Sequence, residues 1–281
     1  MIVNATNKLG GSQGQRGEKV AAKNTTIQHT ADQMIDFINQ VIADRSVNRD
    51  TIYSDLLENL IQAFHRDQSK SDDSFKVTKD QLFDEMVTML IAGAENPKNS
   101  LCWTLHMIHC NPKAKTKIYE ELERLDKDTI TCEDLESLPF LLKVYKECVR
   151  LFPPAYAFSR KAIEDVDIRG FQIHSGQEVV ISPYAIHRNP KYYNNPAEFN
   201  PDNFSEKGQK MRPSLAFLPF GAGPRACIGG QFAMNQGHIV LANLLNCFEF
   251  EHSVPKKSVK MLPLITLQPS SNFRMFVRRR R

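Results

Sequence analysis

One ten-residue segment constrains this chain more than any other. In Phe220–Gly229, glycines surround a single cysteine just before an apolar stretch with helical spacing. The glycines let the backbone adopt positive φ and approach a flat partner closely. Loop amides, the charge of Arg225 and the N-terminus of the following helix all favour a thiolate at Cys227. The segment therefore predicts an iron-binding cysteine, with a buried structural cysteine in a glycine-rich turn as the alternative.

Composition excludes several classes of protein. The 281 residues suffice for one large or two small domains, and 41% apolar with 24% charged residues is ordinary for a globular chain. The net charge of +4, without a long basic stripe, argues against nucleic-acid binding. Six irregularly spaced cysteines indicate a reducing compartment rather than a disulfide framework. No apolar run reaches about 18 residues, so no membrane span is expected, and Arg278–Arg281 are expected to form a solvated tail.

The pattern of apolar residues predicts a mainly helical chain. Residues 1–28 are polar and aperiodic, and we expect them to be disordered. Helices are then predicted over 34–42, 52–64, 79–109, 112–125, 139–151 and 231–245. Thr78 is the expected N-cap of the long third helix, which Gly93 and Pro97 are expected to interrupt.

A small β portion is predicted in the second half. Strands are expected over 156–159, 167–173, 178–182, 248–251 and 273–277, separated by turn residues. Residues 189–220 hold five prolines with many Asn, Gly and Ser residues, which is typical of a long ordered loop. Such loops inside a compact domain are often functional.

The cysteine segment carries a family resemblance. The pattern Phe-x-x-Gly-x-Arg-x-Cys-x-Gly is met at each fixed position by Phe220, Gly223, Arg225, Cys227 and Gly229. It resembles the haem-binding loop of the cytochrome P-450 family, the haem-thiolate monooxygenases. The resemblance implies that Cys227 is the proximal axial ligand of a haem iron, with its electron density favouring O–O cleavage. It also implies that Arg225 pairs with a haem propionate and that Phe220 shields the sulfur.

The long third helix resembles the oxygen-binding helix of that family. Its Ala92-Gly93-Ala94-Glu95 is similar to the stretch Ala-Gly-x-(Asp/Glu)-Thr, where a small residue leaves space for dioxygen and the acid and threonine relay protons. Here Asn96 takes the threonine position and Pro97 follows, and an amide is a poor proton relay. This replacement favours peroxide-type chemistry. A Gly-Pro kink in a core helix is the alternative interpretation.

Other residues match supporting elements of the family. Glu147 and Arg150 resemble its Glu-x-x-Arg pair, which locks a helix to the loop behind the haem, and Asn203 stands where relatives place an arginine that completes the lock. Arg160 stands where relatives place a second propionate arginine, with an ordinary solvated arginine as the alternative. His187, ahead of the long loop, is expected to help fix the loop and propionate geometry.

The resemblance implies a fold and a function. Residues 29–281 are expected to form a partial cytochrome P-450 domain, mainly α with a small β portion, which is the C-terminal, haem-carrying half of the fold. The expected activity is insertion of one oxygen atom of O2 into a small apolar, fatty-acid-like substrate, with electrons from an NADPH-dependent reductase. Full-length relatives are expected at the cytosolic face of the endoplasmic reticulum membrane. This chain is expected to lack their membrane anchor, and its own location is left open, soluble or otherwise.

Two other classes of function stay open. One is a haem-thiolate hydroperoxide isomerase or peroxide-using enzyme, because that branch of the family also lacks the threonine. The other is an inactive, truncated chain that retains the cysteine loop without enclosing haem. A separate zinc site is also conceivable, because Cys102, His106 and Cys110 share one helix face with His109 adjacent. Three ligands so close on one rigid helix cannot readily surround a tetrahedral ion, so packing or surface roles are preferred.

Overall fold

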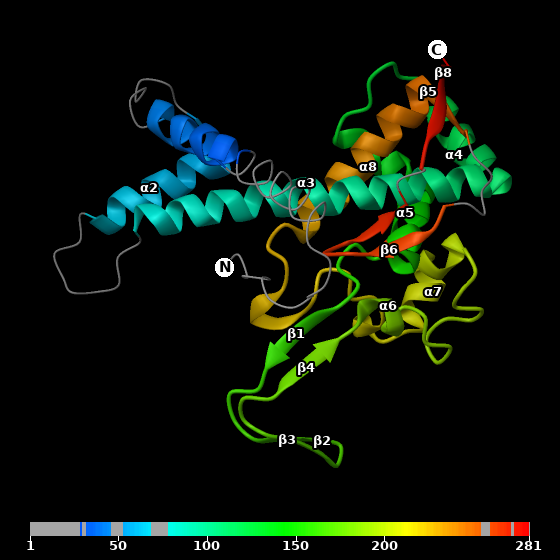
Figure 1. The fold of residues 1–281 in the computed structure, drawn as a ribbon. Coiled ribbons are helices and arrows are strands. Elements are labelled where there is room, and N and C mark those ends of the chain that lie inside the picture. Colours follow the sequence, from blue (N-terminus) through cyan, green and yellow to red (C-terminus); the bar gives the residue numbers. More distant parts are fainter. Residues whose placement is uncertain are drawn as a thin grey trace, which may run out of the picture. The chain divides into compact units, whose positions relative to one another are not determined.

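The computed structural model describes residues 29, 32–45, 53–68, 78–253, 259–270 and 273–280. Among them, the residues up to Ile91 belong to one compact unit and those from Ala92 onward to a second. Figure 1 shows the elements of both units in sequence colours. The expectation of disorder over residues 1–28 lies outside the described residues. No helix in the described ranges is both long and apolar enough to cross a bilayer.

The first unit is helical, as its apolar spacing predicts. It holds a helix over 32–45, helix α2 (Leu56–Gln68) and the beginning of helix α3 (Lys79–Cys110). Each helix buries an aliphatic side chain, namely Ile38, Ile61 and Leu82 in turn. The first two predicted helices are confirmed, and α2 continues past the predicted end at Phe64.

Helix α3 begins at the predicted cap and continues through the predicted interruption. The amide of Gln81 donates to Thr78 Oγ1 at 3.1 Å, and the amide of Thr78 donates to Gln81 Oε1 at 2.8 Å. This reciprocal capping box satisfies two backbone donors at the helix start. The helix then runs through Pro97 as one element. Asn99 and Ser100, in the next turn, are buried. Their packing stabilises the helix there and offsets the loss of the one backbone hydrogen bond that Pro97 removes.

The main core lies between four helices of the second unit. The C-terminal half of α3 packs with α4 (Pro112–Leu125), α5 (Pro139–Leu151) and α8 (Gly230–Cys247). Proline at the first position of α4 and of α5 presets the helical φ, which explains why both starts agree with the sequence prediction. The fully buried core side chains include Ile118, Leu122, Leu138, Leu141, Val144, Leu241 and Leu245.

Helix α4 caps helix α5 through a buried acid. The carboxylate of Glu121 accepts hydrogen bonds from the amides of Phe140 at 2.7 Å and Leu141 at 3.0 Å. An anion at this place satisfies amides that have no partner within the helix and interacts favourably with the helix dipole. Burial raises the pKa of Glu121, and the two amide hydrogen bonds oppose that rise. The cap fixes the start of α5, the helix that carries the buried ion pair of the site.

The strands form antiparallel pairs. The pairs are β1 (Phe158–Lys161) with β4 (Glu178–Ile181), β2 (Val166–Ile168) with β3 (Phe171–Ile173), β5 (Phe248–His252) with β8 (Met275–Arg279), and β6 (Met261–Pro263) with β7 (Leu267–Pro269). The single strand predicted over 167–173 is wrong: it is a hairpin, because Arg169 and Gly170 both have positive φ and reverse the chain. The pair β6–β7 was not predicted, since both strands are short and each ends in proline.

The long loop after β4 contains short helical turns rather than extended chain. These are α6 (Pro183–Ile186), α7 (Glu206–Lys210) and 3₁₀ turns at Pro201–Phe204, Ser214–Ala216 and Gly223–Arg225, with another 3₁₀ turn earlier at Glu133–Ser137. Ser182 and Ser205 cap α6 and α7 by accepting backbone hydrogen bonds. The predicted order of the loop is confirmed, and its local hydrogen bonds lead the chain to the cysteine segment.

Arg278 and Arg279 are exposed to solvent, as the sequence suggested, but they belong to strand β8 rather than to a tail. Arg278 belongs to β8 and lies 3.5 Å from Glu251, and the guanidinium of Arg280 donates to Glu123. Arg280 also lies 4.0 Å above the ring centroid of Tyr119. Because β8 pairs with β5, Arg278 and Arg280 lie next to acidic side chains of the folded chain. Arg281 lies outside the described residues.

Close packing of α8 on α5 depends on one glycine. A Cβ atom at Gly237 would lie 2.2 Å from Cζ of Tyr145 and 2.4 Å from its Cε1. The Tyr145 ring is buried and its hydroxyl lies 3.0 Å from Ser100 Oγ, so the ring has little freedom to move away. Gly237 therefore sets the separation of the helix that follows the cysteine segment from the helix behind it.

We predict that Gly237→Ala lowers the free energy of unfolding by about 1–3 kcal/mol, the usual cost of overpacking a core. Gly93→Ala is the matched control on another helix. A Cβ there meets no atom within 4 Å. Alanine at Gly93 should raise helix stability by about 0.5–1 kcal/mol. Urea unfolding followed by circular dichroism measures both, and equal stability of the two variants would contradict the packing argument.

Candidate functional site

The cysteine segment is an ordered loop that ends at the start of α8. The amide of Cys227 donates to the carbonyl of Phe220 at 2.8 Å, and the amide of Ala226 donates to Gly223 at 3.0 Å. Gly221 and Gly223 have φ of +70° and +76°, values that side-chain-bearing residues rarely adopt. The loop can therefore close on itself only with glycine at these places. Helix α8 begins three residues after Cys227, and its N-cap, Gly229, offers no side-chain acceptor.

The loop presents Cys227 and apolar side chains to solvent. Cys227 is exposed, which excludes the alternative of a buried structural cysteine. Next to it Ile228 is 82% exposed, and Phe232 in the first turn of α8 is 70% exposed. Large apolar side chains gathered around one thiol indicate a surface that an apolar partner covers. A Cβ at Gly229 would lie 4.0 Å from Cys227 Sγ, so the backbone passes close to the sulfur.

The side chain of Arg160 contacts the main chain of this loop at Arg225. Arg160 on β1 donates from Nη2 to the carbonyl of Arg225 at 3.3 Å and from Nη1 to that of Ser159 at 2.8 Å. The guanidinium of Arg160 also lies 4.8 Å above the ring centroid of Phe158. The sequence placed both arginines near one ligand, and the structure brings their chain segments into contact. The guanidinium of Arg160, placed beside the loop, suits a carboxylate of a bound group.

Behind the loop lies a fully buried ion pair on α5. Arg150 donates from Nε and Nη2 to the two carboxylate oxygens of Glu147, both at 2.7 Å. Its remaining hydrogen bonds go to the carbonyls of His187 at 2.8 Å, Pro196 at 2.7 Å and Glu198 at 2.9 Å. Five acceptors thus match the five N–H groups of a guanidinium. The pair is not the ordinary surface salt bridge that its spacing alone suggests, because it anchors the long loop to α5.

Asparagine completes this lock. Asn203 Nδ2 lies 3.2 Å and 3.3 Å from the two oxygens of Glu147, and the amide of Asn200 donates to Glu147 Oε1 at 2.8 Å. The sequence expectation that Asn203 hydrogen-bonds in place of the usual arginine agrees with this geometry. The contribution of Asn200 was not foreseen, since a backbone amide leaves no signal in the sequence.

His187 carries the lock forward to the cysteine loop. The amide of Leu218 donates to His187 Nε2 at 2.8 Å, so Nδ1 is the protonated nitrogen and donates to the carbonyl of Arg150 at 3.2 Å. Leu218 lies two residues before Phe220, where the loop begins. One side chain therefore joins the end of α5 to the entrance of the loop, which is the positioning role that the sequence indicated for His187.

Burial keeps His187 neutral. Desolvation is the main cause that lowers the pKa of His187 to about 4, and the charges of Arg150 and Arg188 lower this pKa further. The hydrogen bond to the Arg150 carbonyl raises the pKa, but by less than desolvation lowers it. A protonated ring would lose the Nε2 lone pair that accepts from Leu218. The link to the loop therefore exists only in the neutral form.

The distal stretch of α3 interacts with β6–β7. Glu95 accepts from Lys98 Nζ at 2.5 Å, from Asn99 Nδ2 at 3.1 Å and from Gln268 Nε2 at 2.7 Å. Asn99 also donates to Thr266 Oγ1 at 2.8 Å. The Lys98 hydrogen bond is the main cause that lowers the pKa of Glu95, so the group is a carboxylate at neutral pH. No sequence signal identified Thr266 or Gln268, because they lie 171 and 173 residues after Glu95 and only the fold brings them close.

Asn96 is engaged within its own helix. Its side-chain amide donates to the carbonyl of Ala92 at 3.2 Å. Gly93 lies beside it in open space, as a Cβ there would meet nothing within 4 Å. The folded chain itself does not require a glycine at this point, and the role of Gly93 in leaving room for a ligand stays a prediction.

Comparison with known proteins decides the family. The cytochrome P450 family model matches residues 20–276. The chain belongs to the cytochrome P450 family. Members of this family carry haem bound through a cysteine thiolate. Two relatives are cytochrome P450 4V2 of Homo sapiens, 32% identical over 74% of this chain, and thromboxane-A synthase of Sus scrofa, 32% identical over 62% of it.

A solved structure supports the fold of this cytochrome P450 chain. A crystal structure of a cytochrome P450 (CYP102L1) superposes with a TM-score of 0.78 and 26% identity, covering 90% of this chain and 57% of that one. The mainly helical fold with a small β portion is thus confirmed. The chain spans 40% of the length of the human relative.

The residues present fit a thiolate-ligated haem. The group is flat and apolar and carries carboxylates, and the loop offers an exposed thiol, exposed apolar side chains and two nearby arginines. Cys227 would hold the iron, and Arg160 with Arg225 would hold the carboxylates. Phe220 packs behind the sulfur loop, since a Cβ at Gly230 would lie 3.2 Å from its Cγ.

We predict that stability falls with acid through His187. Because its pKa is lowered in the folded state, the unfolded chain binds the proton first, and stability is full above the ordinary histidine pKa and decreases below it. From about pH 8 to about pH 5 the loss from this one group should be about 2 kcal/mol. Urea unfolding at both pH values measures it.

The variant His187→Gln should be less stable at neutral pH but should lose about 2 kcal/mol less than the wild type on acidification. His174→Gln, at an exposed histidine near the β2–β3 hairpin, is the control and should keep the wild-type difference. An unchanged acid loss in His187→Gln would contradict the argument. Burial also lowers the pKa of His238, so part of the wild-type loss should persist in both variants.

Proposed function

We propose that this chain supplies the haem-thiolate centre of an oxidoreductase that inserts one oxygen atom of O2 into a small apolar organic substrate. The overall reaction converts RH, O2, two electrons and two protons into ROH and water. An NADPH-dependent reductase supplies the electrons, at the cytosolic face of the endoplasmic reticulum, by resemblance to the family. The observation that carries the proposal is the exposed thiol of Cys227 on a rigid loop at the start of α8.

The proximal residues have distinct roles in this proposal. Cys227 would bind the iron through Sγ, and a thiolate-ligated haem, when bound, would supply oxygen activation because the electron-rich sulfur favours O–O cleavage. Arg225 and Arg160 would hold its two carboxylates, and Phe220 would help to keep water from the sulfur once the haem covers the loop. Gly223 and Gly229 would let the backbone pass close to the ring. Glu147, Arg150 and His187 position the loop and touch none of the reacting atoms.

Exposed apolar side chains favour an apolar substrate. In the turn between β6 and β7, Ile265 is 96% exposed and Leu264 is also exposed. At the end of this turn, Thr266 accepts a hydrogen bond from Asn99 of α3, and Gln268 donates one to Glu95 of the same helix. The turn is thereby fixed beside the distal stretch, where an aliphatic substrate would cover it. This arrangement supports a fatty-acid-like substrate, whose chain offers only apolar contacts along most of its length.

We predict that the purified chain, reconstituted with haem, gives the thiolate signature in its reduced, carbon monoxide-bound spectrum. Cys227→Ala should abolish this signature completely, because no other group replaces the sulfur ligand. Cys132→Ala, at another exposed cysteine, is the matched control and should leave the spectrum unchanged. If the wild-type chain binds no haem, the proposal fails and the chain is an inactive partial domain.

The distal residues favour a second candidate, a hydroperoxide isomerase or peroxide-using enzyme. At neutral pH Glu95 is an ionised carboxylate held by Lys98, and Asn96 already donates to Ala92. An amide does not exchange its proton as a hydroxyl relay does, so neither group delivers protons readily. A hydroperoxide substrate already contains reduced oxygen, so its turnover needs fewer delivered protons.

The variant Asn96→Thr separates the two candidates. If proton delivery limits a monooxygenase, a hydroxyl at position 96 should raise reductase-driven product formation by about 100-fold or more. Asn96→Val is the control, because valine has the shape of threonine without the hydroxyl. Turnover of a hydroperoxide without an electron donor, unchanged by either variant, would favour the peroxide-using enzyme. Strict dependence on the reductase would exclude it.

A further inference from the structure

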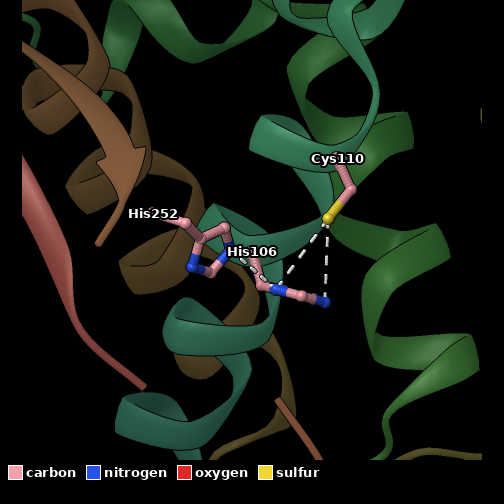
Figure 2. A group of neighbouring side chains, drawn as sticks. All are labelled: His106, Cys110 and His252. Carbon is pink, nitrogen blue, oxygen red and sulfur yellow. Dashed lines mark hydrogen bonds between the residues drawn. The ribbon is translucent and has the colours of Figure 1, made fainter. Parts of the chain in front are cut away.

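A second group of metal-ligating side chains lies at the C-terminal end of α3, apart from the cysteine loop. His106 and Cys110 come from successive turns of α3, and His252 is the last residue of β5. Figure 2 shows the ring of His106 between His252 and the sulfur of Cys110. None of these residues takes part in the proposed haem site.

The ligand atoms converge on a small volume. One nitrogen of each histidine and Sγ of Cys110 all lie within 4.8 Å of one another. His106 Nδ1 lies 2.8 Å from His252 Nε2, and Cys110 Sγ lies 3.9 Å from His106 Nδ1. In a tetrahedral zinc site, Zn–N distances of about 2.0–2.1 Å and a Zn–S distance of about 2.3 Å place neighbouring ligand atoms about 3.3–3.6 Å apart. To reach these separations, the two histidine nitrogens, 2.8 Å apart, must move apart, and Cys110 Sγ, which lies 3.9 Å from Nδ1 and 3.8 Å from Nε2 of His106, must move closer.

The fold removes the objection that the sequence raised. Three ligands from one helix cannot surround an ion, but here the helix supplies only two, at positions i and i+4 on one face. The third comes from β5, whose pairing with β8 fixes its end beside α3. Cys102, the third helical candidate of the sequence analysis, is absent from the cluster.

Aromatic rings hold the histidines in place. His106 is buried, and its ring meets Trp103 edge-on with centroids 5.8 Å apart. Phe273 meets the rings of His106 at 6.4 Å and His252 at 5.7 Å. Packing of this kind fixes ring orientation, which lowers the entropy cost of binding an ion.

We propose that His106, Cys110 and His252 form a binding site for a zinc-class divalent ion, with water as the fourth ligand. Two imidazoles and one thiolate are ligands that zinc prefers over the oxygen-seeking magnesium and calcium. Cys110 and His252 are only half-buried, which leaves an entry path and a place for the water. On binding, the ion replaces the thiol proton of Cys110, and the proton between the two histidines moves to an outer ring nitrogen or to solvent.

The test uses the full chain with zinc and cobalt ions as probes. One equivalent of zinc should bind per chain by titration calorimetry, and cobalt should give tetrahedral visible bands with thiolate charge-transfer absorption. Cys110→Ser and His252→Ala should each weaken binding by more than about 100-fold, since loss of even an outer partner of a ligand costs about 10- to 100-fold. Absence of binding by the wild type would overturn the proposal.

Matched variants isolate the ligands. Cys102→Ser on the same helix and Cys227→Ser in the haem loop should keep both affinity and the cobalt spectrum. His109→Ala removes an imidazole whose ring centroid lies 4.7 Å from that of His252 but which is not among the clustered ligands. It should change affinity less than about threefold, well below the effect of losing a ligand. Loss of the charge-transfer band in Cys227→Ser, or a loss in His109→Ala equal to that in His252→Ala, would refute the assignment.

A measurement on the wild type alone guards against misfolded variants. Zinc should slow alkylation of Cys110 by iodoacetamide at least about tenfold, because a metal-bound thiolate is shielded from the reagent. Cys132, which is exposed and away from the cluster, should react at the same rate with and without zinc. Equal alkylation rates of Cys110 in both conditions would contradict zinc binding at this site.

Discussion

The buried pair of Glu147 and Arg150 is the interaction on which the rest of the site depends. Removing one partner from such a pair typically costs about 3–5 kcal/mol, because a charge is left in the interior without compensation. Here the cost also falls on the long loop, since Arg150 binds the carbonyls of His187, Pro196 and Glu198. His187 in turn receives the amide of Leu218. The position of the cysteine loop is thus set by a chain of hydrogen bonds that begins on α5.

This support explains how the chain tolerates an exposed apolar surface. Ile228 and Phe232 would be more stable if buried, yet they point to solvent beside Cys227. Packing of the core behind the loop keeps α8 in this position, because Gly237 lets the helix approach the Tyr145 ring on α5. A site for a flat cofactor requires rigid elements on one side and an exposed apolar surface on the other.

Local chemistry was predictable from the sequence, and long-range contacts were not. Proline at both ends marks the helix Pro139–Leu151, and glycines mark the loop around Cys227, so both follow from neighbouring residues. The binding of Thr266 and Gln268 to α3 depends on the short pair β6–β7, which carries no periodic signal. His252 meets His106 for the same reason: only the pairing of β5 with β8 places it there. The sequence therefore indicated the α3 residues of these two clusters but not their partners from the β pairs.

Two asparagines replace residues usual in the family, and their consequences differ in kind. Asn203 contributes a neutral amide to Glu147, so the buried lock contains one negative and one positive charge, whereas a second arginine would leave a net positive charge to bury. The neutral amide therefore completes the hydrogen bonds of the lock without adding a charge. At Asn96 the same exchange removes a group that passes protons. An amide serves as well as a charged group where only hydrogen bonding matters, but it changes the chemistry where a proton must move.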